Sequence, residues 1–134
     1  MGTWSHEPFG NDTACDWGYD LVESDDLSLI EQAITSVLET GGYLDADLGS
    51  EVLAAVEVLA KLAGKGTQSD AYTEEIDKWV KKHTFVPGEE LLIRAGQAVD
   101  RVLSDNSELK ELWDETDDST WSESVERLRG LLSA

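Results

Sequence analysis

The segment from Ala46 to Ala63 is apolar on most of its sides, and it limits the possible folds more than any other stretch of the chain. Its large side chains recur at helical spacing and do not alternate as in an exposed strand. They are Leu48, Val52, Leu53, Val56, Leu59, Ala60 and Leu62. Such a helix needs other elements packed around it, because its apolar surface would otherwise face water. We therefore predict that this segment is the central helix of the protein.

Six further segments carry an apolar face at helical spacing, and the alternation of a half-buried strand is absent. They span approximately residues 11–23, 27–39, 70–83, 88–105, 107–115 and 120–132. Hydrophobic residues make up 40% of the 134 residues, which is enough for a folded core. No linker of Gly, Ser and Pro divides the chain. The sequence thus predicts an all-α, single-domain bundle of about seven helices over residues 1–134.

Residues typical of helix ends separate these segments. The candidate N-caps are Asn11 or Asp12, Asp26, Asp70 or Thr73, and Ser107. Gly41 and Gly42 are expected to end a helix in the left-handed conformation, and His83 to end another. Pro87 is expected in a first helical turn. The 64–70 segment, GKGTQSD, is predicted to be a mobile loop.

Aromatic residues suggest how the start of the chain is held. Trp4 and Phe9 precede the first predicted helix, so we expect them to pin residues 1–10 onto the bundle as an ordered arm. The remaining tryptophans fall at core positions by helical spacing. They are Trp17, Trp79, Trp113 and Trp121.

The charge balance is strongly acidic, with 29 Asp and Glu against 10 Lys and Arg and a net charge of -19. Residues 1–60 contain 13 of the acidic residues and no Lys or Arg. Nucleic-acid binding depends on neutralising phosphates with basic side chains, so this composition argues against it. A basic protein is the expected partner, because opposite charge speeds encounter and favours complementary surfaces. Solubility alone is the alternative explanation of the acidity.

The most concentrated charge lies on one face of the first helix. Asp12, Asp16 and Asp20 repeat at intervals of four, and these like charges oppose helix formation slightly. A straight helix is a poor cage for calcium, which prefers a curled loop. We therefore predict a partner-binding ridge, with a merely solvated face as the alternative. Its residues are Asp12, Asp16, Asp20, Glu23, Asp25 and Asp26.

Features that would indicate catalysis or export are weak. Cys15 is the only cysteine, so it forms no internal disulfide, and a reducing cytoplasm is the expected location. We expect no secretory signal and no membrane-spanning segment. His6, Glu7, Asp12 and Asp16 are the residues on which a small metal-dependent hydrolase would rely. No HExxH, CxxC or EF-hand pattern supports one, so we expect no catalytic residue, metal or cofactor.

The opening MGTW, the following PFGNDTACDW and the later RVLSDNSELKELWDE resemble the uncharacterised bacterial family called domain of unknown function 4259. The resemblance covers nearly the whole chain and brings neither an activity nor a cofactor. It implies that the opening is a family signature. The matching residues are Met1, Gly2, Thr3, Trp4, Phe9, Asn11 and Asp12. Ser5 departs from the usual glycine, which puts a tight turn there in doubt.

Three hypotheses of function remain open. The first is an interaction protein, most concretely an immunity or antitoxin-like inhibitor that covers a basic toxin such as a nuclease. The second is a structural or oligomeric helical module without catalysis, whose monomer would expose a large apolar patch. The third is the small metal-dependent hydrolase. The sequence leaves the partner and the oligomeric state undecided.

Overall fold

The computed structural model describes residues 6–116 and 119–132, and within them the chain forms seven α-helices, one 3₁₀ helix and no β-strand. The predicted all-α fold is confirmed. The elements are α1 (Asp12–Val22), α2 (Ser28–Leu38), α3 (Ala46–Leu62), η1 (Ala71–Thr73), α4 (Glu74–Lys82), α5 (Glu89–Leu103), α6 (Glu108–Asp114) and α7 (Thr120–Leu131). Among the described residues, no helix combines the length and the apolar character that crossing a membrane requires.

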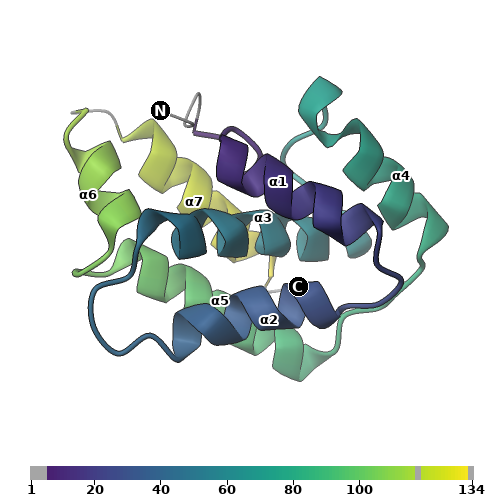
Figure 1. Ribbon diagram of the computed structural model, residues 1–134, viewed down its shortest axis with the longest axis horizontal. Helices are drawn as coiled ribbons and strands as arrows, with labels where there is room; N and C mark the ends of the chain where they lie inside the picture. The colour runs from purple at the N-terminus through teal and green to yellow at the C-terminus, as the bar shows by residue number, and fades with distance from the viewer. Residues whose placement is uncertain (1–5, 117–118, 133–134) are drawn as a thin grey trace.

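Helix α3 occupies the centre of the bundle, as its apolar sequence predicts. It contacts each of the other six α-helices, with α1 on one side and α2 and α5 on the other (Figure 1). Every residue from 52 to 60 is buried, including the carboxylate of Glu57. Burial of this unbroken stretch removes its apolar side chains from water and so stabilises the fold.

The core is one cluster of buried hydrophobic side chains that α3 shares with all its neighbours. Trp17, Trp79 and Trp121 are buried in it, as predicted, and Trp113 is half-buried with its ring stacked on Trp121. Phe9 is 1% exposed, so the arm is held against the bundle from residue 6 onward as expected. Residues 1–5, with Trp4, lie outside the described residues.

Two predictions about helix ends were wrong. Helix α2 ends in a right-handed turn at Glu39, so Gly41 and Gly42 are not needed in the left-handed conformation. Helix α5 begins at Glu89 with Gly88 as its N-cap, which leaves Pro87 outside the first turn. Leu112 is 38% exposed, because the short helix α6 turns Leu109 inward in its place.

Backbone hydrogen bonds outside the helices fix where α3 begins. The N–H of Leu44 donates to the carbonyl of Asn106 at 2.8 Å, and the N–H of Glu108 donates to the carbonyl of Leu44 at 2.9 Å. The Glu108 carboxylate also accepts the N–H of Ala46 at 2.9 Å. The first turn of α3 is therefore tied to the start of α6.

Candidate binding surface

Helix α1 presents its carboxylates on the face opposite its buried residues. Asn11 caps the helix by accepting the N–H of Ala14 at 2.7 Å, which selects one of the two predicted caps. The inward residues are Ala14, Trp17, Gly18 and Leu21. The outward ones are Asp12, Asp16, Asp20 and Glu23, and all four are exposed. The predicted ridge is thus present on α1, and we keep the name α1 ridge for these four residues.

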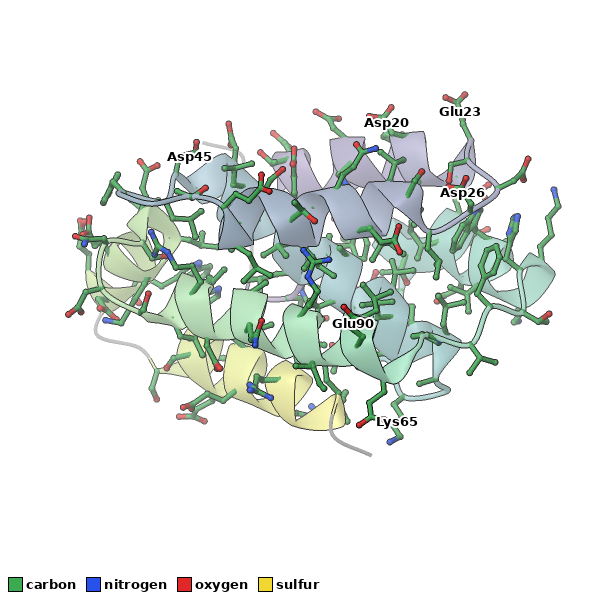
Figure 2. All side chains as sticks on the ribbon, turned by 90° about the horizontal axis from the view of Figure 1, so that it is seen from below. Asp20, Glu23, Asp26, Asp45, Lys65 and Glu90 are labelled. Carbon is green, nitrogen blue, oxygen red and sulfur yellow. The ribbon has the colours of Figure 1, made fainter. Side chains whose placement is uncertain are left out.

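The start of α3 extends this acidic surface beyond what the sequence analysis included. Figure 2 shows Asp20, Glu23 and Asp45 along one edge of the molecule, with Lys65 at the opposite edge. Thr13 of α1 donates a hydrogen bond to Asp47 at 3.1 Å. We call the α1 ridge together with three residues of the α3 start the acidic face. The three additional residues are Asp45, Asp47 and Glu51.

The pKa of Glu51 shows that these charges act on one another. Partial burial raises the pKa of this carboxyl, and the nearby carboxylates of Asp47, Asp45 and Asp20 raise it further. Asp20 belongs to α1, so the charges of the two helices are close enough to interact. The sequence does contain one indication that α3 contributes to this surface. Asp47 and Glu51 are four residues apart, so they share one face of a mostly apolar helix.

Lys and Arg side chains leave the acidic face uncompensated. Among the described residues they form ion pairs with six other carboxylates: Glu57, Glu74, Glu75, Asp77, Asp100 and Asp114. None of these six belongs to the acidic face. Within the described part of the chain, six carboxylates of the acidic face are exposed and that of Glu51 is half-buried, and none of the seven has a Lys or Arg bonded to it.

Asp25 and Asp26, which were predicted with the ridge, have local partners. Asp25 lies 3.2 Å from Nε2 of His83, whose ring stacks on Trp79. Asp26 accepts the N–H of Ser28 at 3.0 Å and its hydroxyl at 2.6 Å, and these bonds lower the pKa of its carboxyl. The Asp25–His83 contact and the bond that Trp79 Nε1 donates to the Ser24 carbonyl at 2.8 Å join this turn to α4, whereas the Asp26 bonds lie within the turn. Both side chains are exposed, so their predicted part in partner binding stays a prediction, and we define the acidic face without them because they have these local partners.

A buried polar network connects the N-terminal arm to the 64–70 segment, and sequence reasoning missed it. Glu57 accepts hydrogen bonds from the N–H and hydroxyl of Thr67 and from the N–H of Gln68. Gln68 in turn accepts the N–H of Phe9 at 2.8 Å. Lys61 lies 3.6 Å from Glu57 and 2.7 Å from Asp77. These bonds hold the segment that was predicted to be mobile.

The residues considered for a hydrolase are divided between two places. His6 and Glu7 line a small pocket with Asn11, Trp113 and Trp121, whereas Asp12 and Asp16 do not line it. Across the described residues, no three His, Cys, Asp or Glu side chains converge in a way that could hold a metal ion.

Cys15 lines a different groove, between α1 and the η1–α4 segment. Its thiol donates to the carbonyl of Phe9 at 3.6 Å. Burial raises the pKa of this thiol, and the carboxylates of Asp12, Asp16 and Asp70 raise it further. A reactive cysteine needs the opposite shift, because the thiolate is the nucleophile. The surroundings of Cys15 therefore suit a thiol that stays protonated.

Comparison with known proteins places the chain in a family. Its residues 2–124 match the family model described as domain of unknown function DUF4259. No curated protein and no solved structure matches the chain. The match spans the N-terminal arm, the α1 ridge and the buried polar network, and it covers most of the 134 residues. The protein therefore belongs to the DUF4259 family.

Proposed function

We propose that this protein binds a basic protein partner through its acidic face, and that it acts as an immunity or antitoxin-like inhibitor of a basic toxin such as a nuclease. The observation that carries the proposal is the set of seven carboxylates on α1 and α3 that have no Lys or Arg bonded to them within the described residues. A cationic surface would gain both faster encounter and complementary contacts there.

The arrangement of charge in α1 supports a binding role over solubility alone. Asp20 and Glu23 lie at the C-terminal end of α1, where the helix dipole disfavours negative charge, and the last turn has no basic residue. The spacing of Asp12, Asp16 and Asp20 adds repulsion between like charges. Charges placed only for solubility would not need to be concentrated where they weaken their own helix. A cationic partner would relieve both effects.

The test measures binding to the product of the neighbouring gene, purified separately, in low and in high salt. A ridge variant neutralises the α1 ridge, and a control variant neutralises four exposed carboxylates on or beside α5, α6 and α7. The ridge variant carries Asp12→Asn, Asp16→Asn, Asp20→Asn and Glu23→Gln. The control variant carries Glu89→Gln, Glu90→Gln, Glu115→Gln and Glu126→Gln. Both change the net charge equally.

We expect salt to weaken the complex, because screening acts on charges at the surface. The ridge variant should bind at least about ten times more weakly than the wild type, corresponding to about 1.4 kcal/mol. The control variant should stay within about threefold of the wild type. Equal losses in the two variants, a complex insensitive to salt, or no binding would each contradict the proposal.

One observation favours the second hypothesis, an oligomeric module. Ile93, which is 54% exposed, lines a groove together with Leu92 and Leu132, and Val86, which precedes the groove residue Pro87, is 89% exposed. Exposed apolar residues next to a groove are typical of an interface between subunits. Sedimentation of the wild type and of Ile93→Asp decides between the two. A dimer that Ile93→Asp converts to a monomer would support the oligomeric module.

A further inference from the structure

The groove beside Cys15 has an apolar floor and an aromatic rim. Phe9, at 1% exposed, and Ile76, at 3% exposed, form the floor together with Gly18. A Cβ atom at Gly18 would lie 3.2 Å from both of these side chains, so glycine lets Phe9 and Ile76 pack directly against α1. Tyr19 and Tyr72 also line the groove, and they are 66% and 60% exposed.

The groove is large enough for one side chain of another protein. It offers about 140 Å³ of space, whereas a cavity that holds one water molecule needs only about 10–15 Å³. The floor is apolar and the rim carries two phenolic rings, so a ligand there needs an apolar stem. An aliphatic side chain would contact the apolar floor but would make no polar or cation–π contact with the tyrosine rings of the rim.

Among the described residues, unpaired negative charge lies along the α1 side of this groove. Cys15 and Tyr19 directly precede Asp16 and Asp20 in α1. The groove side of the helix therefore borders the α1 ridge. Glu75 lines the opposite side and is paired with Lys78 at 3.1 Å. Burial is the main cause of the raised pKa of the Cys15 thiol, and the nearby carboxylates of Asp12, Asp16 and Asp70 raise it further. The occupant should therefore carry positive charge.

We propose that the groove receives an arginine side chain from the basic partner, with its methylene stem on Phe9 and Ile76 and its guanidinium beside Tyr19 and the ridge carboxylates. This inference rests on the proposed function and names the part of the partner that is bound. Arginine fits better than lysine, because a planar guanidinium stacks on aromatic faces and bonds carboxylates in pairs. A second copy of this chain, with a net charge of -19, would bring repulsion to the same place.

Cys15 provides a direct readout, since it lines the groove and is the only cysteine in the chain. The experiment measures its rate of alkylation by N-ethylmaleimide at fixed pH, with increasing concentrations of hexa-arginine, hexalysine or hexaglutamate peptide. We expect hexa-arginine to slow the reaction in a saturable way and hexaglutamate to have no effect. Hexalysine should need at least about a threefold higher concentration for half protection, because it lacks the planar group.

Two tyrosine variants test where the peptide binds. Tyr19→Ala should raise the hexa-arginine concentration for half protection about fivefold, in line with the loss of one cation–π contact. Tyr43→Ala is the matched control, because Tyr43 is 54% exposed and bonds Glu111 on α6, away from the groove. It should leave protection unchanged. Equal protection by the arginine and lysine peptides, or an unchanged Tyr19→Ala variant, would overturn the proposal.

The outcome separates this proposal from the proposed function. If the ridge variant loses the natural partner while Tyr19→Ala binds it normally and Cys15 stays reactive in the complex, the acidic face stands and the arginine site falls. If hexa-arginine protects Cys15 through Tyr19 but the neighbouring gene product does not bind, the arginine site stands and the inhibitor role falls.

Discussion

Burying a carboxylate is unfavourable unless its oxygens accept hydrogen bonds, and at residue scale Glu57 shows how the fold meets this condition. Its side chain has no exposed surface, and it accepts three donors from Thr67 and Gln68. Lys61 adds a partly buried positive charge at 3.6 Å. Gly66 is necessary for this approach, because a Cβ there would lie 2.5 Å from Cγ of Lys61. The buried carboxylate thus organises a loop.

Glu57→Gln is expected to destabilise the protein by about 2–4 kcal/mol, because the amide removes the charge opposite Lys61 and leaves buried N–H donors without a full set of acceptors. The free energy of unfolding in urea measures this. Glu31→Gln on the exposed side of α2 is the control and should change stability by less than about 0.5 kcal/mol. A loss below about 1 kcal/mol for Glu57→Gln would show that the network contributes little to stability.

For Glu51 we predict that removing the charge stabilises the protein, in contrast to Glu57, and that the gain depends on pH. Burial and the neighbouring Asp47, Asp45 and Asp20 raise its pKa above the ordinary 4.5, so the folded state holds the proton more tightly than the unfolded state. The stability that protonation provides is therefore complete below pH 4.5 and is lost as the pH rises through the folded-state pKa.

Glu51→Gln should therefore stabilise the protein at neutral pH by less than about 1 kcal/mol, because the side chain is partly solvated. The gain should disappear below the ordinary pKa of glutamate. Urea unfolding of the variant and the wild type at the two pH values checks this. The same gain at both pH values would mean that the charge on Glu51 is not the cause.

At the scale of elements, what could be predicted followed from periodicity. The α3 helix and the α1 ridge were predictable, because each depends on spacing within one segment. The contacts of Glu57 were not, since its partners come from the 67–68 loop and a lone Glu in an apolar run resembles an interruption. The place of Asp47 and Glu51 beside α1 depends on how two helices cross, and a sequence pattern does not specify that. The groove at Gly18 and Ile76 was unpredictable for the same reason.

Helix α1 itself gives a prediction about charge. Asp16 has like charges four residues away on both sides, at Asp12 and Asp20. Asp16→Asn removes both repulsive pairs with little change in helix propensity, so it should raise stability by about 0.5 kcal/mol in low salt. The gain should vanish in about 1 M salt, where the Debye length falls to roughly 3 Å. Urea unfolding in the two salts measures it, and a gain that persists in high salt would point to a cause other than repulsion.

At the scale of the whole molecule, the N-terminal part of the chain supplies the acidic face. The N-terminal 60 residues hold 13 carboxylates without a Lys or Arg, and the bundle places seven of these carboxylates on the acidic face. The basic residues come from later in the chain, and Lys65 lies at the edge opposite Asp20 and Glu23 (Figure 2). Such an uneven charge distribution creates an electric field around the protein, and this field would orient a basic partner before contact.

This uneven distribution predicts that two variants with the same net charge differ in their response to salt. Repulsion within the acidic face should lower the melting temperature of the wild type at low ionic strength, so raising the salt from about 10 mM to about 0.5 M should raise it by roughly 3–5 °C. The ridge variant should lose most of this rise in melting temperature, because it removes four carboxylates that lie side by side on the exposed face of α1. The control variant, with four dispersed carboxylates removed, should keep most of it. Thermal unfolding followed by circular dichroism measures both. If the two variants respond alike, the salt response depends on net charge alone, and the concentration of carboxylates on α1 and α3 has no energetic consequence for the folded protein.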